Sequence, residues 1–184
     1  EKPEGIYTFA LYAQDEIRLW KNLQILPGFR YVYNEMFKNS FTPKIALMYT
    51  LGNFNFRASY AAGFKTPSIQ ELYYDYENRG AITVGNPDLK PEKANDYNIN
   101  VEYAGKYLNI SANGYINDVK DIIEKYDIGA TDEEKANGIK THNMYQNLDK
   151  ASIKGFDISA NSYLGAGFSA AGSYNCVYAA DDSG

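Results

Sequence analysis

The chain has 184 residues, a formal net charge of −5, 18 Tyr and 9 Phe, but only one His and one Cys. A negative chain without clustered Lys and Arg is not expected to bind nucleic acid, and one Cys cannot form an internal disulfide. The mean hydropathy is −0.48, and no apolar run reaches the roughly 18 residues of a membrane-spanning helix. Transmembrane β-strands are not excluded, because their alternating apolar and polar residues form no such run.

The first third of the chain predicts strands. Apolar side chains recur at every second position, and aromatic residues interleaved with Asn, Ser and Gly favour strands over helices. We expect tight joints near Lys21-Asn22 and Leu51-Gly52, and a longer joint at Lys38-Asn39-Ser40. The alternating segments are residues 7–19, 28–34, 44–51 and 53–60.

A long polar stretch from Ala61 to Asn95 follows these strands. Compact domains seldom place about 30 residues between neighbouring strands unless the loop binds something or is disordered. Pro-containing motifs stand at both ends and restrict the backbone there: Phe64-Lys65-Thr66-Pro67 and Asn86-Pro87-Asp88-Leu89. We expect this to be the functional loop; the alternative is that both motifs simply terminate strands.

Alternation returns after this loop and continues to the end of the chain. Tight joints are expected near Gly105-Lys106 and Gly165-Ala166, and a second long loop over residues 121–147. In total the sequence predicts about eight strands, most of them about 10 to 15 residues long. The later alternating segments are residues 96–103, 108–117, 156–161 and 168–178.

Strand length and loop order both favour a transmembrane β-barrel. Soluble strands average about 5 to 6 residues, whereas a tilted membrane-spanning strand needs about 9 to 11. Short joints alternate with longer ones, as expected when one rim carries turns and the other carries loops. The polar face of the predicted strands is rich in Asn, Ser and Asp, which suits a hydrated barrel lumen. Tyr side chains near strand ends suit interfacial girdles: Tyr7, Tyr49, Tyr60, Tyr103, Tyr107, Tyr163 and Tyr178.

The two ends of the first long loop resemble TonB-dependent outer-membrane receptors. Gly63 to Tyr73 and Gly85 to Glu92 carry this resemblance most strongly, supported by Leu11–Glu16, Leu26–Tyr31 and Lys154–Asp157. The resemblance implies an all-β, antiparallel, up-and-down barrel of roughly 22 strands, closed by a plug. The chain would supply about eight of those strands, with residues 1–184 all in the barrel domain and the plug and other strands absent.

The resemblance also implies a function. Such receptors import iron chelates, heme or cobalamin across the bacterial outer membrane, energised by the TonB complex acting on the plug. We therefore expect a ligand-gated importer whose loops 64–95 and 121–147 help to bind the ligand. The expected surroundings are the lipid bilayer, with a surface lipoprotein as a further candidate partner; no resident cofactor or metal site is expected.

Ligand candidates lie between the two motifs. Heme receptors of this family carry an iron-ligating His there, but this chain has none. Tyr73, Tyr74 or Tyr76 could act instead as phenolate or stacking groups, and Arg79 could meet a propionate or another anion. The alternative is a solvated loop whose aromatic side chains pack on neighbouring loops.

The second long loop adds His142 and Met144 as candidates for contact with a metal or heme, against the simpler view that a lone loop His is solvated. No Ser-His-Asp set and no Gly-rich phosphate loop is present, so an enzyme is not expected.

Two interpretations remain open. In the first, the chain is a fragment of an importer, because Asp181-Asp182-Ser183-Gly184 resembles the beginning of a loop. In the second, it is a free-standing eight-stranded outer-membrane barrel with a structural or adhesive role, since eight strands can close around a filled interior.

Overall fold

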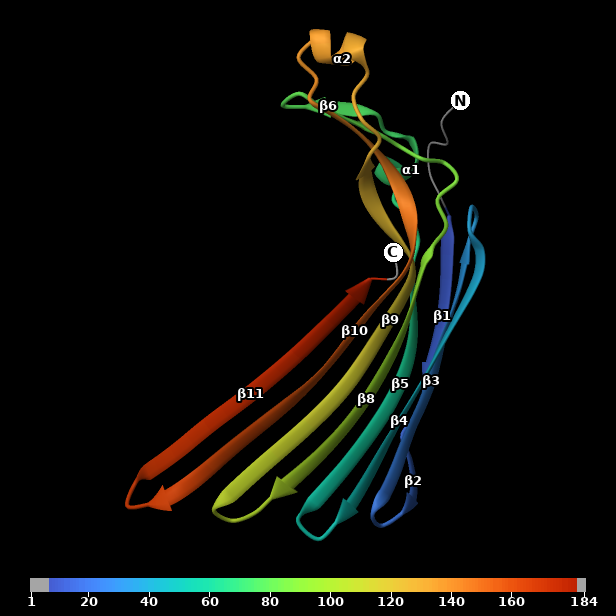
Figure 1. The fold of residues 1–184 in the computed structure, drawn as a ribbon. Coiled ribbons are helices and arrows are strands. Elements are labelled where there is room, and N and C mark those ends of the chain that lie inside the picture. Colours follow the sequence, from blue (N-terminus) through green and yellow to red (C-terminus); the bar gives the residue numbers. More distant parts are fainter. Residues whose placement is uncertain (1–6, 182–184) are drawn as a thin grey trace. The chain divides into compact units, whose positions relative to one another are not determined.

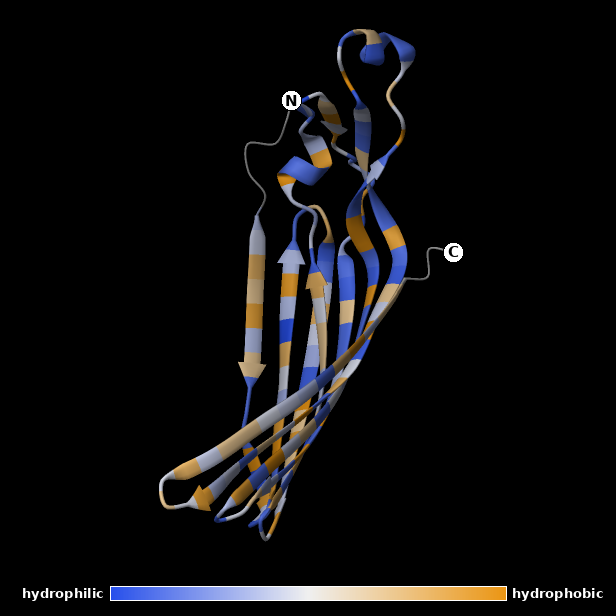
Figure 2. Cartoon of the chain, turned by 60° about the vertical axis from the view of Figure 1, so that its left-hand side comes forward, coloured by the Kyte–Doolittle hydropathy of each residue, from blue (hydrophilic) through white to orange (hydrophobic). Residues whose placement is uncertain are grey.

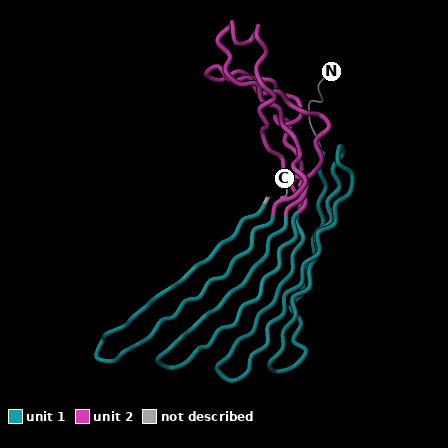
Figure 3. Tube along the Cα trace, in the orientation of Figure 1, with its two compact units in different colours: residues 1–63, 94–118, 152–180 teal, residues 64–93, 119–151, 181–184 magenta. Residues whose placement is uncertain are grey.

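The computed structural model describes residues 7–181, which fall into two compact units (Figure 3). The sheet unit takes its residues from 1–63, 94–118 and 152–180. The loop unit takes its residues mainly from 64–93 and 119–151, the two segments predicted as long loops. The sheet unit is therefore built from strands, and the loop unit holds the connections together with the adjoining ends of the strands.

The sheet unit is an antiparallel meander, so the predicted all-β, up-and-down fold is confirmed (Figure 1). The strand order is β1-β3-β4-β5-β8-β9-β10, with β11 on β10 and β2 on β3. β1 and β2 replace the single first strand expected over 7–19, because residues 15 and 16 interrupt it. The strands are β1 (Thr8–Gln14), β2 (Ile17–Trp20), β3 (Leu23–Asn34), β4 (Lys38–Leu51), β5 (Phe54–Lys65), β8 (Glu92–Ala104), β9 (Leu108–Asp127), β10 (Thr141–Gly165) and β11 (Phe168–Asp181).

The tight turns gather at one end of this sheet, as Figure 1 shows for the joints β2–β3, β4–β5, β8–β9 and β10–β11. Two of them contain residues with positive φ, which closely spaced antiparallel strands require. Gly52 has φ 57° in the β4–β5 turn, and Ala166 and Gly167 have φ 49° and 86° in the β10–β11 turn. All four tight joints lie where the sequence predicts them.

One face of the sheet is apolar and uncovered. Figure 2 shows the alternation of apolar and polar residues along the strands. Leu47, Tyr49 and Leu51 on β4 are 40%, 43% and 55% exposed, and Ile99 on β8 is 62% exposed. Within the described residues nothing packs on this face, as expected for strands that meet lipid. Aromatic rings still contact each other across it: Phe29–Phe41, Tyr49–Phe56, Phe54–Tyr103, Tyr60–Tyr97 and Phe156–Tyr174.

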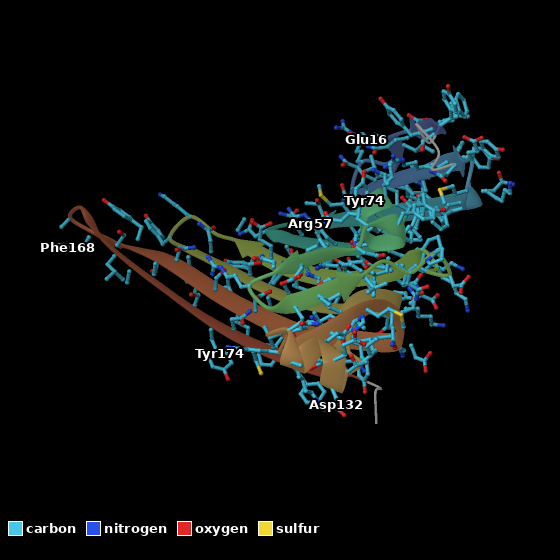
Figure 4. The ribbon with its side chains drawn as sticks, turned by 90° about the horizontal axis from the view of Figure 1, so that it is seen from above. Glu16, Arg57, Tyr74, Asp132, Phe168 and Tyr174 are labelled. Carbon is cyan, nitrogen blue, oxygen red and sulfur yellow. The ribbon has the colours of Figure 1, made fainter. Side chains whose placement is uncertain are left out.

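The opposite face carries a polar network across neighbouring strands. Arg57, labelled in Figure 4, donates to Glu102 at 2.7 Å and to Asn100 at 3.0 Å. Asn100 in turn donates to the Ser111 hydroxyl at 2.9 Å, and Asn113 on β9 donates to Asp157 on β10 at 3.1 Å. These side chains satisfy one another rather than packing as a core, so the face matches the hydrated surface that the sequence predicts.

The joint predicted at Lys38-Asn39-Ser40 is wrong by a few residues, because the β3–β4 turn occupies residues 35–37 and Lys38 opens β4. The buried Asn34 explains the shift. Its Oδ1 accepts from the backbone N–H groups of Met36 and Phe37 at 2.9 and 3.1 Å. A side chain that satisfies two turn amides closes the hairpin earlier than the apolar pattern indicates.

The second long loop is also shorter than predicted. β9 has 20 residues and β10 has 25, so regular pairing replaces much of the segment assigned to a loop over 121–147. At about 3.3 Å per residue these strands are far longer than an apolar band of about 25 Å requires, even when tilted. A membrane-spanning wall would therefore need only part of each of these two strands.

The loop unit contains regular elements that the sequence pattern does not predict. They are α1 (Ile69–Tyr73), β6 (Tyr76–Asn78), β7 (Ala81–Val84) and α2 (Asp132–Ala136). Most of the buried apolar residues of the described chain lie here, in contrast to the sheet unit. They are Leu72, Leu89, Ile123, Ala130, Ile139 and Tyr145.

No helix among residues 7–181 combines the length and apolarity needed to cross a membrane. The prediction that residues 181–184 begin a loop concerns positions 182–184, which lie outside the described residues. Asp181 itself is the last residue of β11.

Gly155 on β10 provides a test of the packing in the sheet unit. A Cβ atom there would lie 2.5 Å from the Tyr115 hydroxyl oxygen and 2.8 Å from the carbonyl oxygen of Cys176. Gly155→Ala should therefore lower the unfolding free energy of the complete protein by about 1 to 3 kcal/mol, the usual range for overpacking. Thermal unfolding in detergent measures this change.

Gly114→Ala on β9 is the matched control, since a Cβ atom there would meet only the Ile99 side chain, at an ordinary 3.6 Å. Equal stability of the two variants would contradict the predicted close approach at Gly155.

Candidate functional site

The two long loops are joined by backbone pairing. β7 from the first loop pairs in parallel with the beginning of β10, with register Thr141↔Ala81 through Met144↔Val84. The N–H of Lys140 donates to the Gly80 carbonyl at 2.7 Å. Parallel pairing is unusual in an up-and-down barrel, and here it makes one folded unit of two segments distant in sequence.

Asn147 on β10 links three segments through one amide side chain. Its Oδ1 accepts from the N–H of Lys90 at 2.8 Å. Its Nδ2 donates to the Lys90 carbonyl at 2.9 Å and to the Asp121 carbonyl at 2.7 Å. Asp121 has φ 56°, a strained value for a non-Gly residue, and this bond helps to hold its carbonyl in place.

Lys65 of the first Pro motif is held by two carboxylates, one in α1 and one at the start of β8. Lys65 pairs with Glu92 at 2.8 Å and lies 3.9 Å from Glu71. The same Glu92 oxygen accepts from the N–H of Ile123 at 3.1 Å, which brings β9 into the contact. Phe64 and Thr66 are partly exposed beside Lys65, whereas Pro67 is buried.

The second Pro motif is anchored by Asn86. Its N–H donates to the Glu71 carbonyl at 2.9 Å, and its Nδ2 donates to the Tyr145 carbonyl at 2.8 Å. Its Oδ1 accepts from the N–H of Asp88 at 2.9 Å, closing an Asx turn. Leu89 is buried, while Pro87 and Asp88 are exposed. Both motifs therefore have structural contacts that position the loop between them.

Tyr76 brings a phenol from the first loop against a Lys from the second. Lys125 Nζ donates to the Tyr76 hydroxyl at 2.8 Å and lies 5.4 Å from the centroid of that ring. The same ammonium lies 5.5 Å from the centroid of the buried Tyr145 ring. We call Tyr76, Lys125, Tyr145 and the buried Thr83 the phenol–ammonium cluster.

This cluster perturbs the ionisation of Tyr76. The hydrogen bond from Lys125 comes first, followed by those involving Tyr145 and Thr83, and together they lower the pKa of Tyr76 from 10.0 to about 8. Burial raises the pKa of Tyr145, so Tyr76 is the phenol of the pair that ionises first. An ammonium that donates to a phenol oxygen favours the charged phenolate.

The other ligand candidates of the first loop, Tyr73, Tyr74 and Arg79, lie outside the phenol–ammonium cluster. Tyr74 is 52% exposed and Tyr73 is partly exposed, and both have interactions with neighbouring groups. Arg79 is exposed in the β6–β7 turn with φ 51°. Neither Tyr73 nor Tyr74 belongs to the phenol–ammonium cluster, and Arg79 stands at the end of the hairpin that carries Tyr76.

His142 is partnered rather than simply solvated. Its Nδ1 lies 2.9 Å from Glu134 Oε1, and both side chains are mostly buried. A backbone hydrogen bond from Thr131 and then the contact with His142 hold the pKa of Glu134 below its usual value. Met144 lies two residues farther along β10, opposite Val84. Glu134 thus fixes His142 to the α2 segment.

Among residues 7–181 no group of three or more His, Cys, Asp or Glu side chains is arranged to hold a metal ion. The candidate groups are instead aromatic, phenolic and basic, and come from both loops. Such groups can bind an anionic or aromatic chelate through ionic contacts, stacking and a phenolate oxygen.

Several residues of the site are absent from the sequence prediction, including Lys125, Tyr145 and Asn147. The two capping boxes were a usable signal for the helices, because Ser68 and Glu71, and Thr131 and Glu134, exchange the hydrogen bonds that begin α1 and α2. No local pattern marks Asn147 or Lys125, since their partners are distant in sequence.

Comparison with known proteins gives one family. A family model described as TonB dependent receptor-like, beta-barrel matches residues 3–184. The heme/hemopexin utilization protein C of Haemophilus influenzae is 30% identical over 141 residues, which are 66% of this chain and 20% of that protein. The ferric enterobactin receptor of Pseudomonas aeruginosa is 24% identical over 167 residues, 81% of this chain and 22% of that protein.

Among solved structures, the siderophore receptor PirA from Pseudomonas aeruginosa has a TM-score of 0.85 at 22% sequence identity. The alignment covers 96% of this chain and 35% of that one, and it supports the fold. The chain spans only about a fifth of the length of these two curated relatives.

Asn147→Ala should loosen the joined loops. The change removes three hydrogen bonds and leaves the Lys90 and Asp121 groups without that partner, which costs roughly 1 to 3 kcal/mol in local stability. Limited trypsin digestion of the complete protein should then cut faster after Lys93, the next Lys along the chain, since Pro91 prevents cleavage after Lys90.

Asn161→Ala is the control, because Asn161 is exposed on the same strand β10. Unchanged cleavage of Asn147→Ala relative to this control would contradict the role of Asn147 as the link.

Tyr76 should titrate below the ordinary pKa of a tyrosine. In the difference spectrum between the complete protein and its Tyr76→Phe variant, tyrosinate absorbance should rise with a midpoint near pH 8. In a Lys125→Met background the midpoint should move upward toward the ordinary Tyr value of about 10, because the ammonium that favours the phenolate is gone. A midpoint near 10 with Lys125 intact would contradict the observed contact.

Proposed function

Because the chain belongs to the TonB-dependent receptor-like β-barrel family, we propose that it is part of a receptor that imports an iron chelate or heme. Its location is the bacterial outer membrane, and its family consists of transport receptors rather than enzymes. In the complete protein, energy would reach the barrel through the TonB complex acting on a plug domain. The segments 64–95 and 121–147 would contribute ligand contacts.

The observation that carries this proposal is the folding of both long loops into one unit. A barrel wall needs only short turns, and most connections between strands have a median of about 4 to 6 residues. Here the connections instead hold their own buried side chains, two capped helices and a hairpin. Ordered loops on a rigid barrel are typical of a binding surface.

The proposed ligand contacts follow from side-chain chemistry. Tyr73, Tyr74 and Tyr76 offer aromatic faces and phenol oxygens on one loop, with Arg79 at its hairpin turn for an anionic group. His142 and Met144 come from the second loop. The motif residues of the first loop, including Lys65 and Asn86, would position these groups rather than touch the ligand, because their side chains are bonded to other parts of the loop unit.

The cargo classes we propose are heme and ferric siderophores, the ligand types named for the relatives above. Cobalamin, expected from the family resemblance, remains a candidate for the same assay. A surface lipoprotein partner also remains a proposal.

The alternative of a free-standing eight-stranded barrel has less support. In the described part of the chain, β1 pairs with β3 and β11 pairs with β10, which leaves these two strands at the sheet edges. A closed barrel would pair its edges with each other. The open sheet therefore favours a role as part of a larger wall.

Binding to the complete receptor tests the proposal. Hemin, ferric enterobactin and cobalamin are titrated separately, and we expect at least one of the two iron ligands to bind. Removing loop residues 69–83 should weaken that binding at least tenfold while the barrel stays folded, because the aromatic candidates are removed together.

The control shortens the β10–β11 turn, which lies at the tight-turn end of the sheet. Full affinity without residues 69–83 would refute the role of this loop. Absence of binding by both hemin and ferric enterobactin would refute the proposed cargo, whether or not cobalamin binds.

A further inference from the structure

A pocket of about 260 Å³ opens on the sheet unit over β1, β3, β4 and β5. Two cationic side chains line it, Arg30 from β3 and Lys44 from β4, and both are exposed. Tyr12 and Gln14 from β1 and Thr42 from β4 complete its polar lining. No Asp or Glu of the described chain lines this pocket, so it is positively charged.

The sheet register brings the two cations close to each other. Arg30 is opposite Thr42 on β4, and Lys44 is two residues beyond Thr42, opposite Gly28. Diagonal neighbours of this kind lie about 7 to 8 Å apart, near enough for one small anion to contact both side chains. Among residues 7–181 neither cation forms an ion pair, since the ion pairs there use other basic residues. Two uncompensated like charges are unfavourable until an anion neutralises them.

Gly28 allows Lys44 to reach across β3. Lys44 Nζ donates to the side-chain oxygen of Gln14 on β1, so the Lys44 side chain passes over the β3 backbone. A Cβ atom on Gly28 would lie 2.7 Å from Lys44 Cε and 3.1 Å from Lys44 Cγ. The ammonium is thus held in place by an amide, which carries no charge and leaves the positive charge of Lys44 uncompensated.

We propose that Arg30, Lys44 and Tyr12 form a binding site for a single oxyanion group, the carboxylate or phosphate of a small solute. Gln14 and Gly28 act only by positioning Lys44. The site uses none of the loop residues proposed to contact the cargo, so this inference goes beyond the proposed function and does not depend on it.

Each of the three side chains supplies a different kind of donor. The Arg30 guanidinium presents a planar fork of N–H groups that matches two oxygens of a carboxylate or phosphate. Lys44 has three N–H donors, and the bond to Gln14 uses one of them. Tyr12 is directly opposite Arg30 in the β1–β3 register and adds an O–H donor. This combination of donors and positive charge favours oxyanions over neutral or cationic groups.

The volume of the pocket limits the size of the group that it binds. Sites for drug-sized ligands usually measure about 300 to 1,000 Å³. The 260 Å³ available here lies below that range. A phosphate ion or the carboxylate end of a larger solute therefore suits the pocket better than a whole metal chelate.

Chemical protection of Lys44 tests the site in the complete receptor. The receptor in a non-ionic detergent is treated with acetic anhydride at constant ionic strength, with inorganic phosphate replacing chloride, and mass spectrometry follows the acetylation of each Lys. Phosphate should slow the acetylation of Lys44 in a saturable manner, because the bound anion covers the ammonium. Lys21, exposed in the turn between β2 and β3, is the internal control and should react at a constant rate.

Two charge variants show whether Arg30 takes part. Arg30→Gln should raise the phosphate concentration for half-protection of Lys44 roughly tenfold, the loss expected from one charge-assisted hydrogen bond. Arg18→Gln is the matched control, because Arg18 is an exposed cation on β2, also paired with β3, that does not line the pocket. It removes the same charge and should leave the half-protection concentration unchanged.

Gly28→Ala separates geometry from charge. It keeps both cations but places a Cβ atom against Lys44, so phosphate protection of Lys44 should weaken by a similar factor. Gly114→Ala is its control, since the added Cβ atom would meet only Ile99, at 3.6 Å. Both variants are compared below their thermal unfolding transitions, so that only folded receptor is measured.

Four outcomes would overturn the inference. The first is equal acetylation of Lys44 in phosphate and in chloride. The second is an equal loss of protection in Arg30→Gln and Arg18→Gln, which would indicate only general attraction by positive charge. The third is full protection in Gly28→Ala. The fourth is a Lys44 that is unreactive with or without phosphate, because a carboxylate of the receptor itself would then occupy the pocket. None of these outcomes concerns hemin or ferric enterobactin, so the proposed function is tested separately.

Discussion

A strand that crosses lipid must satisfy every backbone N–H and C=O group through its neighbours, because the bilayer offers no other partner. The sheet unit meets this constraint by lateral pairing alone, from β1 through β11. It needs no apolar core: one face leaves Leu47, Tyr49 and Ile99 exposed, while the other joins Arg57, Asn100 and Glu102 by hydrogen bonds. The paired sheet is therefore rigid, and the connections between its strands can vary in length and sequence.

Beyond the wall the constraint changes, because loops in water need a core or a network to stay ordered. The loop unit has both. Leu72, Leu89 and Tyr145 are buried, and Asn147 and Glu92 each link β9 to the first loop. The pairing of β7 with β10 makes the loops depend on each other for their order. Such a unit brings side chains from segments distant in sequence into contact. Tyr76 and Lys125 are one such pair, in which an ammonium group donates a hydrogen bond to a phenol oxygen.

Most strands and tight turns of the sheet could be predicted from the sequence, because side-chain alternation and turn residues such as Gly52 and Gly165 are local signals. It misplaced the β3–β4 turn, where the side chain of Asn34 rather than apolar periodicity decides. Within the loops it identified Tyr76 as a candidate, but not Lys125 or Tyr145, whose importance arises only through pairing across about 50 to 70 residues of chain. His142, considered as solvated or as a ligand, pairs with Glu134, a partner that belongs to a capping box, and its contact with a ligand stays a prediction.

The central claim is that the two loops form one cooperative unit that binds the cargo. Hydrogen exchange of the complete receptor, free and with bound hemin or ferric enterobactin, tests it most directly. Amides of residues 81–90 and of residues 141–147 should open with a common free energy in the free receptor and slow together when the chelate binds. Independent exchange of the two segments, or protection confined to one of them, would contradict the account.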